Sequence, residues 1–201
     1  SLLVHRLKIA LGLRERLYPG PYYRLVYGEA DGVPGLVVDR YGDYLVVQIT
    51  TAGMEREREA VVAALEKVLK PAGILWRNDS GICELEGLPR YVELAAGEVP
   101  ALLTVEEGGA RFQVDPHGGQ KTGWFYDQAA NRERLLRYVP GARVLDVCSY
   151  VGAWGVRAAL AGASAVSCVD SSAQALEAVA ANAGLNGVGD RVEGLRGEAQ
   201  A

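Results

Sequence analysis

Short apolar strands alternate with helical segments over the last third of the chain, and this alternation limits the fold more than any other feature. We expect strands over residues 142–146 and 165–170, with helices over 127–138, 153–161 and 172–185. A strand that returns through a helix to a neighbouring strand builds a parallel sheet. The pattern therefore predicts an α/β, Rossmann-like unit.

The first part of the chain has a different pattern. Leucines at near-helical spacing over residues 3–18 predict an amphipathic helix, which Pro19-Gly20-Pro21 ends. The apolar runs 35–39 and 44–50 flank a short turn and predict an antiparallel hairpin.

A helix over 54–69, a strand over 73–77 and a second hairpin over 102–114 follow. We therefore expect a linker helix at 1–20, a small α+β domain at 21–116 and the first part of a cofactor-binding domain at 117–201.

Composition narrows the class of protein. Apolar residues make up 49% of the chain, no run approaches the length of a membrane span, and the N-terminus does not resemble a signal peptide. We expect a soluble, cytoplasmic protein without a membrane partner. The three cysteines are widely spaced, so they predict neither a disulfide framework nor a metal site.

The net charge of −4 disfavours binding to nucleic acid through a general excess of positive charge. Local basic patches remain open, and Arg132, Arg134 and Arg137 form one candidate group. On charge pattern alone, such arginines are more often a solvated helix face.

The strongest local signal is an apolar strand that runs through Asp146 into a turn of small residues. A dinucleotide fingerprint would place its last two glycines at Gly152 and Gly155, but Tyr150 then stands where the backbone must approach a diphosphate. This disfavours a nicotinamide- or flavin-dependent oxidoreductase. S-adenosylmethionine has no diphosphate, and its positively charged sulfonium and amino groups suit an acidic strand end such as Asp146.

Asp170 ends the next strand, 24 residues after Asp146. An acidic side chain there can accept hydrogen bonds from both ribose hydroxyls of an adenosine. Ser171 or Ser172 is expected to cap the following helix, and Ser171 with Gln174 fits a capping box. Glu198 is a further candidate, as an acidic contact near the adenine.

A second run, residues 115–128, has the glycines and the Lys-Thr pair of a phosphate-binding loop. The comparison fails because Gln120 stands where glycine must precede Lys121. The aromatic residues 124–126 that follow are typical of an ordinary core cluster.

Three runs of the sequence resemble the RlmI-type methyltransferases, which form 5-methylcytosine in bacterial large-subunit ribosomal RNA. They are residues 28–43, residues 120–128 with Asn131-Arg132, and residues 144–152. The resemblance covers nearly the whole chain. It implies an S-adenosylmethionine-binding, class I methyltransferase domain of which this chain holds the N-terminal half, preceded by the small α+β domain.

The resemblance also implies a set of residues that contact the cofactor. These are Lys121, Thr122, Phe125, Asp127, Arg132, Asp146, Ser149, Gly152 and Asp170. The family attacks cytosine with a cysteine thiolate, a form of covalent catalysis. None of the three cysteines here matches that position, so no catalytic residue is assigned.

The chain departs from the family at both ends. Neither the N-terminal RNA-binding domain of the PUA type nor the C-terminal half of the catalytic domain is present, so we expect a fragment. A half-sheet would expose apolar strand surface and an unpaired edge, and a homodimer could cover that edge. One alternative to the enzyme is a non-catalytic fragment that binds RNA or a protein partner.

Overall fold

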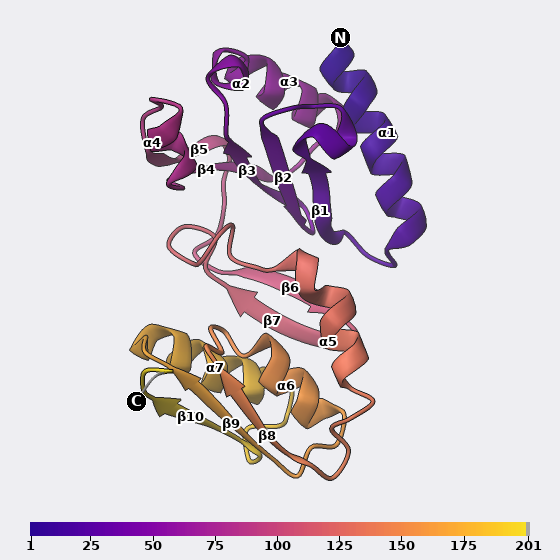
Figure 1. Cartoon of the computed structure of the whole chain (residues 1–201). Helices are drawn as coiled ribbons and strands as arrows, with labels where there is room; N and C mark the ends of the chain where they lie inside the picture. Colours follow the sequence, from indigo (N-terminus) through magenta and orange to yellow (C-terminus); the bar gives the residue numbers. More distant parts are fainter. Residues whose placement is uncertain (200–201) are drawn as a thin grey trace. The chain divides into compact units, whose positions relative to one another are not determined.

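The computed structural model describes residues 1–199, apart from the side chain of Ile82, and divides them into two units (Figure 1). The first unit comprises residues 1–103 and 115–126, and the second comprises residues 104–114 and those from 127 on. The chain therefore crosses between the units three times.

A five-stranded mixed sheet forms the first unit. Its strands are β1 (Tyr22–Tyr27), β2 (Leu36–Tyr41), β3 (Tyr44–Ile49), β4 (Gly73–Asn78) and β5 (Tyr91–Gly97), in the order β1-β2-β3-β4-β5. Neighbouring strands are antiparallel except β3 and β4, which are parallel. The predicted hairpin is confirmed as β2 and β3, whereas the sequence patterns did not reveal β1 and β5.

Two helices of this unit, α1 (Leu2–Leu17) and α3 (Arg58–Leu69), pack against each other and share the apolar core with the sheet. Their buried members include Leu7 and Leu65, which cluster with Trp76 of β4. The helix predicted over 54–69 begins earlier, as the short α2 (Ala52–Arg56), and restarts as α3. The 3-10 segment η1 (Gly28–Asp31) and α4 (Ile82–Leu85) complete the unit.

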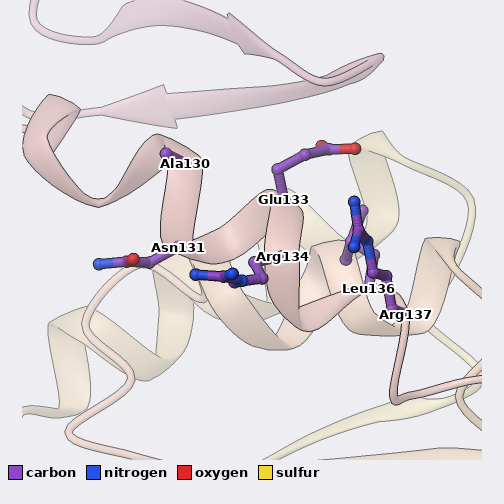
Figure 2. A pocket seen from close by; sticks show the side chains of 6 residues that line it. All are labelled: Ala130, Asn131, Glu133, Arg134, Leu136 and Arg137. Carbon is purple, nitrogen blue, oxygen red and sulfur yellow. The ribbon is translucent and has the colours of Figure 1, made fainter.

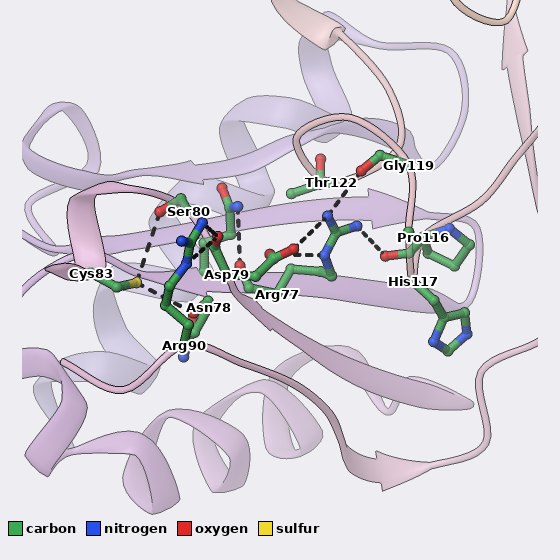
Figure 3. Close-up of polar contacts among 12 residues, drawn as sticks. Arg77, Asn78, Asp79, Ser80, Cys83, Arg90, Pro116, His117, Gly119 and Thr122 are labelled. Carbon is green, nitrogen blue, oxygen red and sulfur yellow. Dashed lines mark hydrogen bonds and ion pairs between the residues drawn. The ribbon is translucent and has the colours of Figure 1, made fainter. Parts of the chain in front are cut away.

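The segment 115–126 is held against this sheet by buried polar side chains (Figure 3). Arg77, only 4% exposed, donates to the carbonyl oxygens of Pro116 at 2.5 Å and of Gly119 at 2.9 Å, and it also pairs with Asp79. A charged donor that satisfies several acceptors in the interior restricts the segment to one path.

A second anchor lies three residues further along. The Thr122 hydroxyl donates to Asp39 at 2.5 Å, and Tyr41 donates to the Thr122 carbonyl oxygen at 3.0 Å. Asp39 is fully buried and also accepts two hydrogen bonds from Arg24. The carboxylate is therefore neutralised within the unit, as a buried charge must be.

A three-stranded parallel sheet lies at the centre of the second unit. Its strands are β8 (Arg143–Val147), β9 (Ala165–Asp170) and β10 (Val192–Arg196), in the order β10-β9-β8. Side chains on one face, including Leu145 and Leu195, are 65% and 46% exposed. The apolar strand surface expected from the sequence is therefore present.

The other face of this sheet is covered by helices. Helices α6 (Ala153–Leu160) and α7 (Ala173–Leu185) contact the strands and each other, and η2 (Tyr126–Gln128) leads into α5 (Ala129–Leu135), which contacts α6. Ser172 caps α7 by accepting a hydrogen bond from the Ala175 N–H at 3.2 Å. The capping box from Ser171 was wrong, because the preceding Asp170 carboxylate holds the Ser172 N–H and leaves Ser172 extended at the helix start.

The hairpin of β6 (Leu103–Glu107) and β7 (Ala110–Val114) belongs with the second unit, although the sequence boundary at 116/117 assigned it to the α+β domain. Side-chain amides of α7 cause this: Asn182 accepts from the Gln113 N–H at 2.8 Å, and Asn186 accepts from the Arg111 N–H at 3.0 Å. Each amide also donates to the carbonyl oxygen of the same residue. The hydrogen-bonded residues of α7 and β7 lie about 70 positions apart in the sequence. The boundary between the two units therefore differs from the boundary that local sequence patterns predicted.

Within residues 1–199, no helix is both long enough and apolar enough to cross a lipid bilayer.

We predict that Gly155→Ala destabilises the second unit by about 1–3 kcal/mol, because the added methyl group overpacks the interface between α6 and the sheet. A Cβ at Gly155 would lie 2.5 Å from the Cys168 sulfur and 3.1 Å from a Val166 methyl group. Urea unfolding measures the loss. Adding Cys168→Ala should restore part of it, and a Gly155→Ala variant as stable as the parent would contradict this packing.

Candidate functional site

The loop between β8 and α6 has an unusual backbone. Cys148 and Tyr150 adopt positive φ angles of 60° and 50°, and Gly152, the N-cap of α6, has φ 80°. Only glycine adopts this conformation at no steric cost, and non-glycine residues that do so cluster at functional sites. Residues 148–152 therefore form a strained, compact turn at the carboxyl end of the sheet.

Asp146 lies at the base of this turn and is partly buried. Its carboxylate accepts a hydrogen bond from the Gly155 N–H at 3.0 Å, across the close contact between α6 and the sheet. Burial raises the pKa of Asp146 to about 6, and the nearby charge of Asp170 adds to the rise, while the Gly155 hydrogen bond opposes it. A carboxylate in this state is stabilised by any cation that reaches it.

Asp170 ends β9 beside the same turn. One oxygen accepts a hydrogen bond from the Tyr150 N–H at 2.9 Å and the other from the Ser172 N–H at 3.0 Å. Each carboxylate oxygen can accept more than one hydrogen bond. Asp170 therefore orders the turn and keeps acceptor capacity for a ligand's hydroxyl groups.

Ser149 carries the clearest sign of a missing partner. Its residue is 3% exposed, and its hydroxyl oxygen is the buried side-chain polar atom without a hydrogen-bond partner among the described residues. Buried polar groups are nearly always paired, so an orphan at a strained turn indicates a ligand contact. The turn thus fits a ligand with a positive charge, hydroxyl groups and a polar group near Ser149.

The other predicted contacts are placed as follows. Lys121, Thr122 and Phe125 belong to the first unit, and the remaining seven belong to the second. The Lys121 side chain is exposed and its ammonium lies 4.2 Å from the centre of the Phe125 ring, whereas Thr122 is buried with its hydroxyl on Asp39. A cofactor contact from these three residues stays a prediction.

Arg132 is 1% exposed, and its guanidinium makes two hydrogen bonds of 2.7 Å to Glu107. Arg157, also buried, pairs with the same carboxylate at 3.1 Å and with Glu133. The guanidinium of Arg132 therefore ties α5 to the hairpin. Sequence reasoning missed Glu107, because its partners lie 25 and 50 positions away and no local pattern marks it.

Two predicted residues lie at the surface. Asp127 is exposed in η2, where it accepts a hydrogen bond from the Gln128 side chain, and Glu198 is exposed just after β10. Their roles as cofactor contacts stay predictions.

The cysteines differ in exposure. Cys83 and Cys168 are buried, and Cys148 is exposed in the turn. Burial raises the pKa of the Cys168 thiol to about 12, and the Asp146 charge adds to the rise. Because the thiolate is the reactive form, this raised pKa disfavours Cys168 as a nucleophile.

A family model described as S-adenosylmethionine-dependent methyltransferase matches residues 43–198. The chain belongs to this family. Its cofactor is S-adenosylmethionine, in agreement with a turn that offers a carboxylate for a cation and a second carboxylate for hydroxyl groups.

Two curated relatives are both named ribosomal RNA large subunit methyltransferase I. The one from Shigella boydii is 42% identical over 165 residues, and the one from Klebsiella pneumoniae is 41% identical over 171 residues. These matches cover 82% and 83% of this chain but only 42% of each relative. The chain thus spans less than half the length of these relatives.

Solved structures confirm the fold class. A candidate S-adenosylmethionine-dependent methyltransferase from Streptococcus mutans matches with a TM-score of 0.86 at 22% identity, over 98% of this chain and 52% of its own. A candidate methyltransferase complexed with SAH matches equally well, over 99% of this chain and 52% of its own. The tRNA m1G37 methyltransferase of M. jannaschii has a TM-score of 0.64 at 23% identity, over 81% and 49% of the two chains. The fold is α/β and Rossmann-like.

We predict that Asp146→Asn stabilises the ligand-free chain at about pH 7.5 by on the order of 1–3 kcal/mol. The folded pKa of about 6 exceeds the ordinary value of 3.8, so the fold binds the proton more tightly and loses stability as pH rises between those values. The amide removes this cost and can still accept from Gly155. Urea unfolding should show the gain reduced to about half near pH 5.

Glu177 is exposed, so the variant Glu177→Gln serves as the control for the loss of one negative charge. A gain for Asp146→Asn that does not change with pH, or that Glu177→Gln reproduces, would contradict the burial of the Asp146 charge.

Proposed function

We propose that this chain provides the S-adenosylmethionine site of a methyltransferase that acts on large-subunit ribosomal RNA, with carbon 5 of a cytosine as the acceptor. The orphaned hydroxyl of Ser149 between the two acidic strand ends carries the cofactor part of the proposal. The names of the curated relatives support ribosomal RNA as the substrate, and the RlmI-type resemblance supports cytosine. A ribosomal RNA substrate supports the proposal of a cytoplasmic protein.

Each polar residue of the turn has a distinct role in this proposal. Asp146 faces the positively charged amino acid end of the cofactor, Asp170 accepts from its ribose hydroxyls, and Ser149 gains the hydrogen bond that it lacks. When bound, the cofactor supplies an electrophilic methyl group. Gly152 is buried at the start of α6, where a φ of 80° excludes most side chains and an added Cβ would lie 3.2 Å from Val179; its backbone is a proposed cofactor contact on the strength of the resemblance.

The remaining predicted contacts are part of the same proposal. Arg132 is held by Glu107, so we propose that it acts mainly by positioning α5. The resemblance supports proposed cofactor contacts from Lys121, Thr122, Phe125 and Asp127. Glu198 is a proposed contact because of its position after the third strand of the sheet.

The methyl-accepting chemistry belongs to the longer protein in this proposal. Attack on cytosine requires a cysteine thiolate, and Cys168 remains a neutral thiol because burial raises its pKa to about 12. We therefore assign cofactor binding to this chain and no nucleophile.

We predict that Ser149→Ala weakens binding of S-adenosylhomocysteine about five- to tenfold, by loss of one hydrogen bond, and leaves folding stability unchanged or slightly higher. Removal of an unpaired buried hydroxyl group does not lower the folding stability of the free protein. A loss of affinity without a loss of stability therefore indicates a ligand contact and not a structural role. Calorimetric titration and urea unfolding measure the two effects. Ser164→Ala, which removes an exposed hydroxyl bound to Ala142, should leave affinity unchanged.

We also predict that Asp170→Ala weakens the same binding by about 1–3 kcal/mol, through loss of charge-assisted hydrogen bonds to the ribose. Because the carboxylate also accepts from Tyr150 and Ser172, we expect a loss of about 1 kcal/mol in stability as well. Unchanged affinity in both this variant and Ser149→Ala, or no binding by the parent chain, would refute the proposed site.

A further inference from the structure

Residues of α5 and of the turn after it line an open hollow of about 510 Å³ (Figure 2). Asn131 and Arg134 are three residues apart on α5, so their side chains project from one side of the helix, and Arg137 lines the hollow from the turn. Ala130, Glu133 and Leu136 complete the lining. The hollow is large enough to admit a nucleotide.

The two arginines in this hollow are not neutralised. Arg134 and Arg137 are exposed, and neither side chain has an ion-pair or hydrogen-bond partner among residues 1–199. Their neighbour Arg132 differs, because it is buried and bound to Glu107. The acidic residue of the lining, Glu133, pairs with Arg157, so its charge is already balanced. The hollow therefore carries a local positive charge on a chain whose net charge is −4.

The residue directly after Arg137 in the sequence carries an exposed aromatic ring. Tyr138 is 75% exposed, and its side chain makes no hydrogen bond, ion pair or ring contact with the described residues. Tyrosine usually buries most of its ring or pairs its hydroxyl group. Uncovered aromatic rings beside arginines are typical of surfaces that stack unpaired bases while the guanidinium groups bind phosphates.

We propose that the surface formed by Asn131 and Arg134 of α5 and by Arg137 and Tyr138 of the turn after it binds the backbone of the substrate RNA. Arg134 and Arg137 each bind a phosphate, for which the planar guanidinium is suited. Tyr138 stacks on an unpaired base. This inference rests on the proposed function, since it assumes that the substrate is RNA, and it adds the surface that holds that RNA.

Salt-dependent RNA binding tests the proposal directly. The probe is a fluorescein-labelled RNA hairpin with a single-stranded, cytidine-containing loop, titrated with the full chain by fluorescence anisotropy. The double variant Arg134→Gln with Arg137→Gln should bind at least tenfold more weakly at about 50 mM salt. Its slope of log affinity against log salt should fall by about 1.4 to 1.8, the value for two lost phosphate contacts.

A matched control removes the same charge elsewhere. Arg16 and Arg56 are also exposed, their side chains have no hydrogen-bond or ion-pair partner among residues 1–199, and both belong to the first unit. Arg16→Gln with Arg56→Gln should leave both affinity and salt slope close to those of the parent. Tyr138→Ala should weaken binding about fivefold or more, whereas Tyr138→Phe should retain it, because stacking requires the ring and not the hydroxyl group.

Titration with S-adenosylhomocysteine separates this inference from the proposed function. The α5 variants should bind it as the parent does, and loss of that binding in the parent would refute the proposed function instead. The RNA surface is overturned if the α5 double variant matches the Arg16 and Arg56 control, or if the parent chain does not bind the hairpin. Equal binding of polyglutamate, an acidic peptide, would overturn it in favour of a protein partner.

Discussion

The close approach of α6 to the sheet at Gly155 is the constraint on which the second unit depends. Because Gly155 has no side chain, α6 packs closely against Cys168, and the Gly155 N–H donates a hydrogen bond to the Asp146 carboxylate. The same approach buries that carboxylate and raises its pKa to about 6. The buried charge of Asp146 therefore lowers the stability of the free chain, and in the proposed site a cationic ligand would relieve that cost.

A second set of charges determines where α5 points. Glu107 of the hairpin binds both Arg132 and Arg157, so one face of α5 is directed into the second unit. The opposite face of so short a helix must then face solvent, and Arg134 on that face is exposed. Arg137, in the turn after the helix, is exposed as well. The buried network thus accounts both for the position of α5 and for the exposed positive charge beside it.

Much of the architecture follows from local pattern. The α1 helix, the β2–β3 hairpin, and the alternation of β8, α6, β9 and α7 each carry a periodicity or a turn signal within a few residues. Strand β5 lacked such a signal, and so did the boundary between the units. That boundary depends on Asn182 and Asn186 of α7, which bind β7 from far along the sequence.

By itself, the sequence determined the class of the site: a strand ending in Asp146, a glycine turn without room for a diphosphate, and a second acid at Asp170. These are local features, so the steric properties and charges of neighbouring residues are enough to predict them. Only the tertiary structure decided which polar groups are engaged and which remain open. Arg132 and Thr122 are held by Glu107 and Asp39, whereas the Ser149 hydroxyl has no hydrogen-bond partner within residues 1–199. Burial and pairing depend on residues brought together from distant parts of the chain.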